Sequence, residues 1–232
     1  MAAERRIDTP GEGRVNPESP LASISLRNAR PEDAAAVAGI LAHAFPGLYR
    51  GTFGRLDFTA IHALLQNLYK QGHLSLDDTR VCEVNGQVAG IMILHTGRPI
   101  GRGSAADFWR LLRRRYGLLR APRMFAGGIL SNLMLDSRIP RASDLVYIEA
   151  LAVAEAHRGN GIGTRLLADA EEWARTNGRS RLALHVLANN TGARRLYERV
   201  GFRLWDVAGS GKRWANSTSA PMWAALLMVR DI

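Results

Sequence analysis

Residues 145–167, LVYIEALAVAEAHRGNGIGTRLL, decide the predicted fold of this chain. The first nine residues are almost continuously apolar, which is typical of a strand buried on both faces. A glycine-rich loop follows them and leads into an amphipathic segment over 164–177 that predicts a helix. A second apolar run, RLALHVL (181–187), comes next. This order of strand, loop, helix and strand is a βαβ unit, so we expect its two strands to be parallel.

The flanking chain predicts further strands and helices around this unit. Asn85-Gly86 lies between two apolar, β-rich runs, and this dipeptide supplies the positive φ angles of a tight hairpin turn. Helical spacing of apolar residues marks two earlier helices. The expected ranges are a strand at 23–29, helices at 30–45 and 56–72, strands within 80–96, a helix at 190–201 and strands at 202–207 and 222–229. Together they predict an α/β fold of the α+β type, with helices flanking one mixed sheet.

The composition suits one globular domain. The chain has 232 residues, 47% of them hydrophobic, without internal repeats or a long linker. Residues 1–22 mix charge, proline and glycine, so we expect a flexible N-terminal arm before a single domain over 23–232. No apolar run reaches the ~20 residues of a membrane helix, so we expect a cytoplasmic protein without a membrane partner. Cys82 is the only cysteine, and the histidines show no ligand spacing, so no disulfide or metal site is expected.

A basic segment precedes the strand that begins the βαβ unit. The whole chain carries a formal net charge of +10, and residues 98–143 hold ten arginines and two aspartates. We expect this insert to form one helix from about Ser104 and a second helix broken at Gly127-Gly128. The pattern leaves open whether the insert is a lid over an acceptor site or an element for packing or dimerisation. Nucleic-acid binding is a less favoured alternative, because no exposed aromatic residues are expected to be interleaved with the arginines.

The glycine loop points to a ligand that carries phosphate groups. Glycine-rich turns leave backbone N–H groups directed at one spot, and the N-terminus of the following helix adds about half a positive charge there. No Gly-Lys-Ser/Thr follows, so the loop is not a Walker A motif. The spacing also fails G-x-G-x-x-G, because Thr164 and Leu166 stand where the third glycine is needed. The loop alone therefore predicts an anion site without naming its ligand.

Two ordered motifs identify the loop more closely. Residues 158–163, RGNGIG, match R-x-x-G-x-G between a strand and an amphipathic helix, and residues 190–202, NTGARRLYERVGF, match N-x-x-A-x-x-L-Y-x-x-x-G-F. In both motifs the chain resembles the GCN5-related N-acetyltransferase (GNAT) family, closely over 145–204 and in outline over 23–97. The resemblance implies the acyl-coenzyme A N-acyltransferase fold, a mostly antiparallel mixed sheet with one splayed parallel pair of strands. It does not account for the insert.

The resemblance also implies where acetyl-coenzyme A, the expected acetyl donor, would bind. Backbone amides of the loop would hold its pyrophosphate, and the strand before the loop would pair with its pantetheine arm. Two residues at the start of the last helix match positions that touch the coenzyme. The implied coenzyme-binding residues are Leu151, Ala152, Val153, Arg158, Gly159, Asn160, Gly161, Ile162, Gly163, Thr164, Asn190 and Ala193.

Acyl transfer to an amine needs a neutral nucleophile, stabilisation of an oxyanion and a proton for the departing thiolate. Tyr197 matches the frequent general acid of the family. Two residues are candidates for the general base. Glu149 is a lone acid in an apolar strand, where burial raises its pKa, and the ordinary pKa of His185, ~6.5, suits proton transfer near neutrality. The sequence does not rank these two residues.

The resulting hypothesis is an N-acetyltransferase. It would move an acetyl group from acetyl-coenzyme A to a primary amine of a small molecule or of a protein or peptide, by direct transfer in a ternary complex. Its partners would be the coenzyme and the amine acceptor, with a homodimer left open. The alternatives are a catalytically silent acyl-coenzyme A sensor and, less favoured, a nucleic-acid-binding protein that uses the basic insert.

Overall fold

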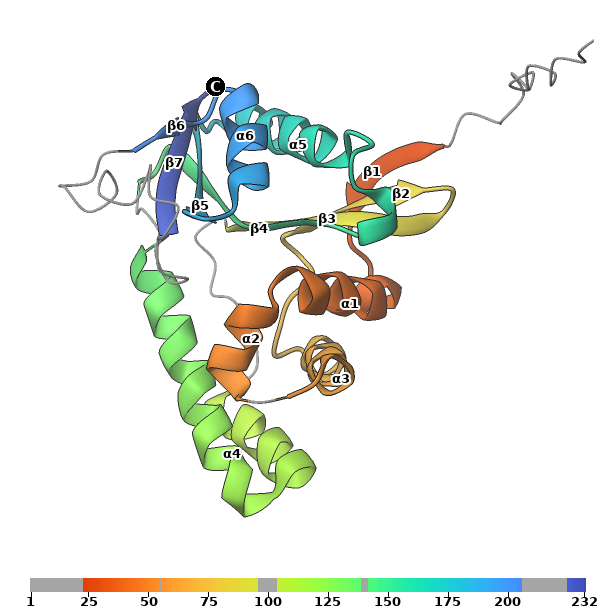
Figure 1. The fold of residues 1–232 in the computed structure, drawn as a ribbon, viewed down its shortest axis with the longest axis vertical. Coiled ribbons are helices and arrows are strands. Elements are labelled where there is room, and N and C mark those ends of the chain that lie inside the picture. The colour runs from red at the N-terminus through yellow and green to blue at the C-terminus, as the bar shows by residue number, and fades with distance from the viewer. Residues whose placement is uncertain (1–22, 55, 96–103, 139–141, 206–224) are drawn as a thin grey trace, which may run out of the picture.

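A single mixed sheet forms the centre of the molecule (Figure 1). The computed structural model describes residues 23–54, 56–95, 104–138, 142–205 and 225–232. The seven strands lie in the order β1-β2-β3-β4-β5-β7-β6, and β4 with β5 is the parallel pair among antiparallel neighbours. The strands are β1 (Ile24–Asn28), β2 (Thr79–Val84), β3 (Gln87–His95), β4 (Leu145–Val153), β5 (Arg181–Leu187), β6 (Arg203–Leu204) and β7 (Ala225–Asp231). The predicted mixed sheet and parallel pair are confirmed.

Helices cover both faces of the sheet (Figure 1). One face carries α5 (Ile162–Thr176) and α6 (Thr191–Arg199), and the other carries α1 (Ala34–Ala44), α2 (Pro46–Phe53), α3 (Phe58–Lys70) and α4 (Ala105–Arg138). Short 3-10 turns, η1 (Pro31–Asp33) and η2 (Glu155–His157), precede α1 and the glycine loop. No helix within the described ranges is both long and apolar enough to cross a membrane.

The alternation of side chains along the strands divides the described interior into two large apolar cores and a small cluster of Tyr147, Ala183 and Val229. Leu166, Leu167 and Leu182 lie in the core between the sheet and α5 and α6. Val37 and Ile91 lie in the core between the opposite face and α1, α3 and α4. A strand that is apolar on both faces, such as β4, is therefore explained by helices on both sides of it.

The parallel pairing of β4 with β5 is short. It joins Leu145–Ile148 to Arg181–Leu184, after which β4 pairs only with β3 and β5 only with β7. The two central strands therefore separate beyond Ile148, which agrees with the splayed pair implied by the resemblance.

A β-bulge lies where the strands separate. The β3–β4 register skips Glu149, because Ile148 and Ala150 face consecutive residues of β3. Such a bulge reverses which face the later residues occupy. Val146 and Ile148 face α5, whereas Ala150 and Ala152 belong to the core under α1, α3 and α4. The bulge thus places Glu149 beside Ala150 on the α1–α4 face.

The insert and its neighbourhood differ from the prediction in two respects. The two predicted helices of the insert are the two segments of α4, which meet at Gly117, where a φ of 74° and a ψ of 174° turn the chain back on itself. The further break predicted at Gly127-Gly128 is absent. Gly127 is instead a site of close approach, because a Cβ there would collide with the Thr52 carbonyl oxygen of α2. Helix α2 was not predicted, since PGLYRGTF contains two glycines and a proline, although Pro46 occupies a first-turn position that suits proline.

Other predicted elements lie where expected, within small shifts of their ends. Asn85 and Gly86 have φ angles of 53° and 78°, as the hairpin turn requires. The N-terminal arm at 1–22 and the predicted strand residues 206–207 and 222–224 lie outside the described residues.

Helix α5 can reach the sheet because β3 has a glycine beneath it. A Cβ on Gly90 would lie 2.7 Å from Cγ2 of Ile162, so Gly90→Ala is expected to reduce the free energy of unfolding by about 1–3 kcal/mol through overpacking. Gly39→Ala is the matched control, because its Cβ would meet only His62 at 3.6 Å inside α1, and alanine there should be neutral or stabilise by up to about 1 kcal/mol. Urea unfolding of both variants measures the contrast, and equal stabilities would contradict it.

Candidate active site

Beyond the end of the parallel pairing, β4 has one open edge. The amide of Ala154 donates to the Ala89 carbonyl of β3 over 2.8 Å, and alternate residues of an antiparallel strand bond to the same neighbour. Leu151 and Val153 therefore direct backbone groups toward the side from which β5 has departed. Nε of Arg158 donates to the Val153 carbonyl over 3.2 Å. This edge has the geometry to pair with an extended, amide-containing ligand.

Ala152, the third strand residue implied as a coenzyme contact, is placed differently. By the same alternation its backbone groups face β3. Its side chain is buried in the core on the α1–α4 face. Of the three strand residues, Leu151 and Val153 are thus the two with backbone groups on the open edge.

The glycine loop lies directly after this edge. Gly159 and Gly161 have φ angles of 82° and 75°, and Gly161 is the N-cap of α5. A side chain in this conformation would cost roughly 1–2 kcal/mol. Arg158, Gly159, Asn160, Gly161 and Thr164 are exposed. The first amides of α5 have no partner within the helix, so the loop and helix end present N–H groups on an accessible surface.

Ile162 and Gly163 anchor the loop from below. The Ile162 side chain is buried against the sheet, which leaves only its backbone for a ligand. A Cβ on Gly163 would lie 3.0 Å from Cδ2 of Leu196, so this glycine permits α5 to approach α6. The two motifs of the sequence are therefore packed against each other in space.

The start of α6 also belongs to this region. Oδ1 of Asn190 accepts a hydrogen bond from the Ala193 amide over 3.1 Å and caps the helix. Both residues matched coenzyme contacts in the sequence. The cap is a structural role for them, and a coenzyme contact stays a prediction.

Tyr197 is buried in the core beneath α6. Its ring lies 5.9 Å from the ring of Phe202, centroid to centroid. Burial raises the pKa of its hydroxyl to about 12. Tyr197 is not among the described residues with a fully buried side-chain oxygen or nitrogen that lacks a hydrogen-bond partner. At neutral pH its hydroxyl is protonated.

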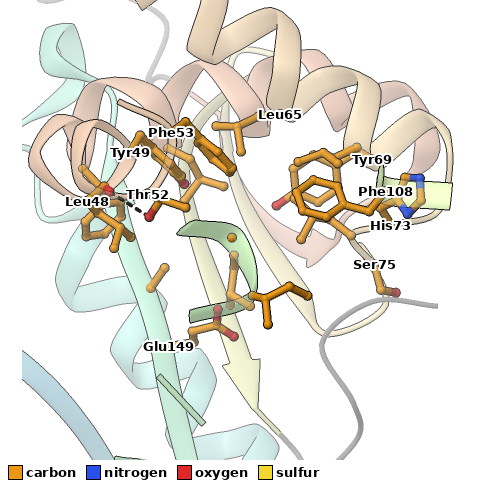
Figure 2. A pocket seen from close by; sticks show the side chains of 18 of the residues that line it. Leu48, Tyr49, Thr52, Phe53, Leu65, Tyr69, His73, Ser75, Phe108 and Glu149 are labelled. Carbon is orange, nitrogen blue, oxygen red and sulfur yellow. Dashed lines mark hydrogen bonds between the residues drawn. The ribbon is translucent and has the colours of Figure 1, made fainter. Parts of the chain in front are cut away.

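A cavity of about 460 Å³ opens on the other face of the sheet (Figure 2). Helices α1, α2 and α3 form much of its wall, α4 contributes from both sides of its bend, and β3 and β4 form its floor. The wall is mainly apolar and aromatic, through Leu41, Phe45, Leu48, Tyr49, Phe53, Leu65, Leu68, Tyr69, Leu74, Phe108 and Ile129. The basic insert is therefore part of the cavity through the apolar side of its helices.

Glu149 is the acid that lines this cavity. Figure 2 shows its carboxyl at the β4 side, across from the tyrosines of α2 and α3. Burial, with a smaller contribution from Asp78, raises the pKa of Glu149 to about 7. Burial likewise raises the pKa of Tyr49 and of Tyr69, and the nearby Glu149 adds to both shifts. The cavity thus holds a carboxyl group able to exchange a proton near neutral pH.

His185, the other candidate base, lies elsewhere. It is on β5, where its Nδ1 lies 2.9 Å from the Tyr147 hydroxyl, and the two rings meet edge to face. It is on the same side of the sheet as Glu149 but does not line the cavity. Of the two candidate bases, Glu149 and not His185 lines this cavity.

Sequence reasoning missed Tyr49 and Tyr69. Both lie on helices that contribute to the cavity, but one of these helices was not predicted. The i, i+4 spacing of Tyr49 and Phe53 was a signal for an apolar face on α2. Spacing alone does not reveal that this face borders a cavity.

Comparison with known families matches the part of the chain that contains the glycine loop and α6. A model described as the acetyltransferase (GNAT) family matches residues 58–202. Among curated proteins, the uncharacterized N-acetyltransferase YycN of Bacillus subtilis (strain 168) is 41% identical over 66 residues, which are 28% of this chain and 42% of that protein. The chain spans less than half the length of the first curated relatives it matches.

Solved structures agree with the fold. An N-acetyltransferase from Staphylococcus aureus Mu50 has a TM-score of 0.59 at 19% identity, covering 90% of this chain and 100% of that one. The paia N-acetyltransferase of Thermoplasma acidophilum in complex with coenzyme A has a TM-score of 0.52 at 14% identity, covering 90% and 99%. At these identities the similarity establishes the fold.

The raised pKa of Glu149 predicts a pH-dependent effect on stability. The folded chain holds the proton up to about pH 7, whereas the unfolded carboxyl loses it near 4.5. Ionisation therefore destabilises the fold as pH rises through this window. Glu149→Gln should match the parent at pH 4 and exceed its stability at pH 8 by on the order of 2 kcal/mol. Urea unfolding at the two pH values measures this, with Glu172→Gln on the exposed side of α5 as the charge control. An equal difference at both pH values would refute the raised pKa of Glu149.

Proposed function

Because the chain belongs to the GNAT acetyltransferase family, we propose that it transfers an acetyl group from acetyl-coenzyme A to a primary amine held in the cavity. The observation that carries this proposal is the position of Glu149. It lies at the bulge of β4, where the open strand edge on one side and the cavity on the other meet. Donor and acceptor would therefore approach each other at this point of the sheet.

The donor half of the proposed site uses mainly backbone groups. Amides of Gly159 to Gly163 and the N-terminus of α5 suit a pyrophosphate, and Thr164 adds an exposed hydroxyl. The open edge at Leu151 and Val153 suits the amides of a pantetheine arm. Exposure of the loop and the left-handed glycines support this assignment.

The acceptor half uses side chains. A mainly apolar and aromatic cavity of about 460 Å³ favours an amine with an apolar body, either a small molecule or the terminal residue of a peptide. The Glu149 carboxylate would bind the acceptor's ammonium group and then remove its proton. A polar hydrophilic amine would leave the aromatic wall without a matching surface.

The proposed chemistry is direct transfer. Glu149 accepts a proton from the acceptor's ammonium, and the neutral nitrogen attacks the thioester carbonyl to form a C–N bond and an oxyanion. Collapse of this intermediate breaks the C–S bond, and the amine's second proton is lost to water. The Tyr197 hydroxyl donates a hydrogen bond to the departing sulfur. With a pKa of about 12, the Tyr197 hydroxyl is a weaker acid than a thiol of pKa ~8.5. If Tyr197 gives its proton to the sulfur, it regains a proton from water.

An amine panel with acetyl-coenzyme A, followed by release of the free thiol, tests the function. We expect turnover with arylalkyl or branched alkyl primary amines, or with peptides that begin with an apolar residue, and little with short polyamines. Coenzyme binding without thiol release for any amine would leave a silent acyl-coenzyme A sensor. Absence of coenzyme binding would refute the whole assignment.

Tyr197→Phe tests the proposed donor to the sulfur. The variant keeps the ring packing against Phe202 and removes only the hydroxyl, so kcat should fall by at least ~10-fold while the Kd of coenzyme A changes little. Steady-state kinetics and calorimetric titration of coenzyme A measure the two quantities. Parental kcat in this variant would remove Tyr197 from the mechanism.

The pH dependence of catalysis distinguishes the two candidate bases. With an alkylamine acceptor that stays protonated throughout, the slope of log kcat/KM against pH should decrease by one near pH 7, where Glu149 becomes ionised. Glu149→Gln should lower kcat/KM by about 10²-fold and lose this inflection, and His185→Gln should retain it. The opposite pattern would assign the base to His185.

A further inference from the structure

The bend of α4 forms an apex that projects away from the sheet (Figure 1). Two leucines stand at this apex without apolar neighbours to cover them. Leu118 is 68% exposed and Leu119 is 97% exposed. They follow Gly117 directly, so they occupy the outermost turn of the helical hairpin. Burial of these two leucines therefore contributes nothing to the stability of the fold.

Arginines surround these leucines on both helical segments. Three precede the bend and two follow it, and all five are exposed: Arg113, Arg114, Arg115, Arg120 and Arg123. In the described part of the chain none of them forms an ion pair with a carboxylate, whereas Arg110, farther from the bend, pairs with Asp107. The apex is thus a concentrated positive charge around an exposed apolar tip.

Helix stability does not account for this arrangement. The three arginines before Gly117 suit the negative end of the first segment's dipole, but Arg120 stands in the first turn of the second segment, where positive charge is unfavourable. Neither the charge after the bend nor the exposed leucines therefore contributes to folding. An exposed apolar tip surrounded by positive charge that the fold does not use indicates a partner outside the chain.

We propose that this apex, residues 113–123, docks on an anionic lipid bilayer. The leucines would enter the apolar side of the headgroup region while the guanidinium groups pair with lipid phosphates. A nucleic acid would use the arginines but offers no apolar phase for two adjacent leucines. The docking is peripheral and requires no membrane-spanning helix.

Docking at the apex would set the height of the cavity above the lipid. Phe108 and Gly128, which line the cavity, lie nine and eleven residues from Gly117 along the two segments. At 1.5 Å per residue they stand roughly 13–16 Å from the bend. The enzyme body would therefore remain in water with the cavity close to the membrane surface.

Sedimentation with vesicles tests the proposal on the full chain without any acetyl transfer. The protein should sediment with phosphatidylcholine vesicles that contain phosphatidylglycerol, not with phosphatidylcholine alone, and added salt should release it. Leu118→Gln with Leu119→Gln should lower the affinity at least ~10-fold. Arg120→Gln with Arg123→Gln should lower it about 25-fold, roughly fivefold for each charge near the surface.

The matched control removes two arginines elsewhere. Arg199→Gln with Arg203→Gln makes the same change in net charge on exposed residues near α6 and β6, at the end of the molecule remote from the apex (Figure 1). It should retain most of the affinity. Equal losses in the control and the Arg120/Arg123 variant, or no sedimentation of the parent, would overturn the proposal. Leucine variants that keep full vesicle affinity, or a parent that prefers duplex DNA over vesicles, would overturn it as well.

Discussion

The short parallel pairing between β4 and β5 is the constraint on which the rest of the structure depends. The two strands bond only from Leu145–Ile148 to Arg181–Leu184, and then each continues with its outer neighbour. The separation leaves backbone groups of Leu151 and Val153 without a strand partner, and only the Arg158 side chain, which donates to the Val153 carbonyl, is seen to bond to this edge in the described residues. Helix α5 follows directly and rests on β3 only because Gly90 leaves room for Ile162. The glycine loop is therefore held at the mouth of the separation by the packing of the core.

The two halves of the candidate site are built by different means. The half next to the glycine loop consists mostly of backbone amides, whose positions follow from the fold, so any chain with this loop and strand edge presents a similar surface. The cavity half consists of side chains from four helices and two strands, so its shape and chemistry change with each substitution. The bulge at Glu149 joins the two halves, because it turns one carboxyl into the cavity from the strand that also forms the open edge.

Sequence patterns alone predicted those helices, strands and turns whose formation depends mainly on residues near them in the chain. The βαβ unit, the Asn85-Gly86 hairpin and helices α1, α3, α5 and α6 all follow from periodicity and turn chemistry. The break predicted at Gly127-Gly128 was wrong, because a glycine serves either a positive φ, as at Gly117, or a close contact, as at Gly127, and the residue type does not tell which. The raised pKa of Glu149 was foreseen from its position in an apolar strand. The cavity was not, because its walls come from segments far apart in sequence, one of them the unpredicted α2.

The most direct test of the account is hydrogen exchange of the backbone amides with and without coenzyme A. If the loop and the open edge of β4 hold the coenzyme, exchange should slow at the amides of 158–164 and of Leu151 and Val153. Exchange in α1 and α3, which line only the cavity, should be unchanged. Protection confined to the cavity helices, or no protection at the loop at saturating coenzyme A, would contradict the central claim.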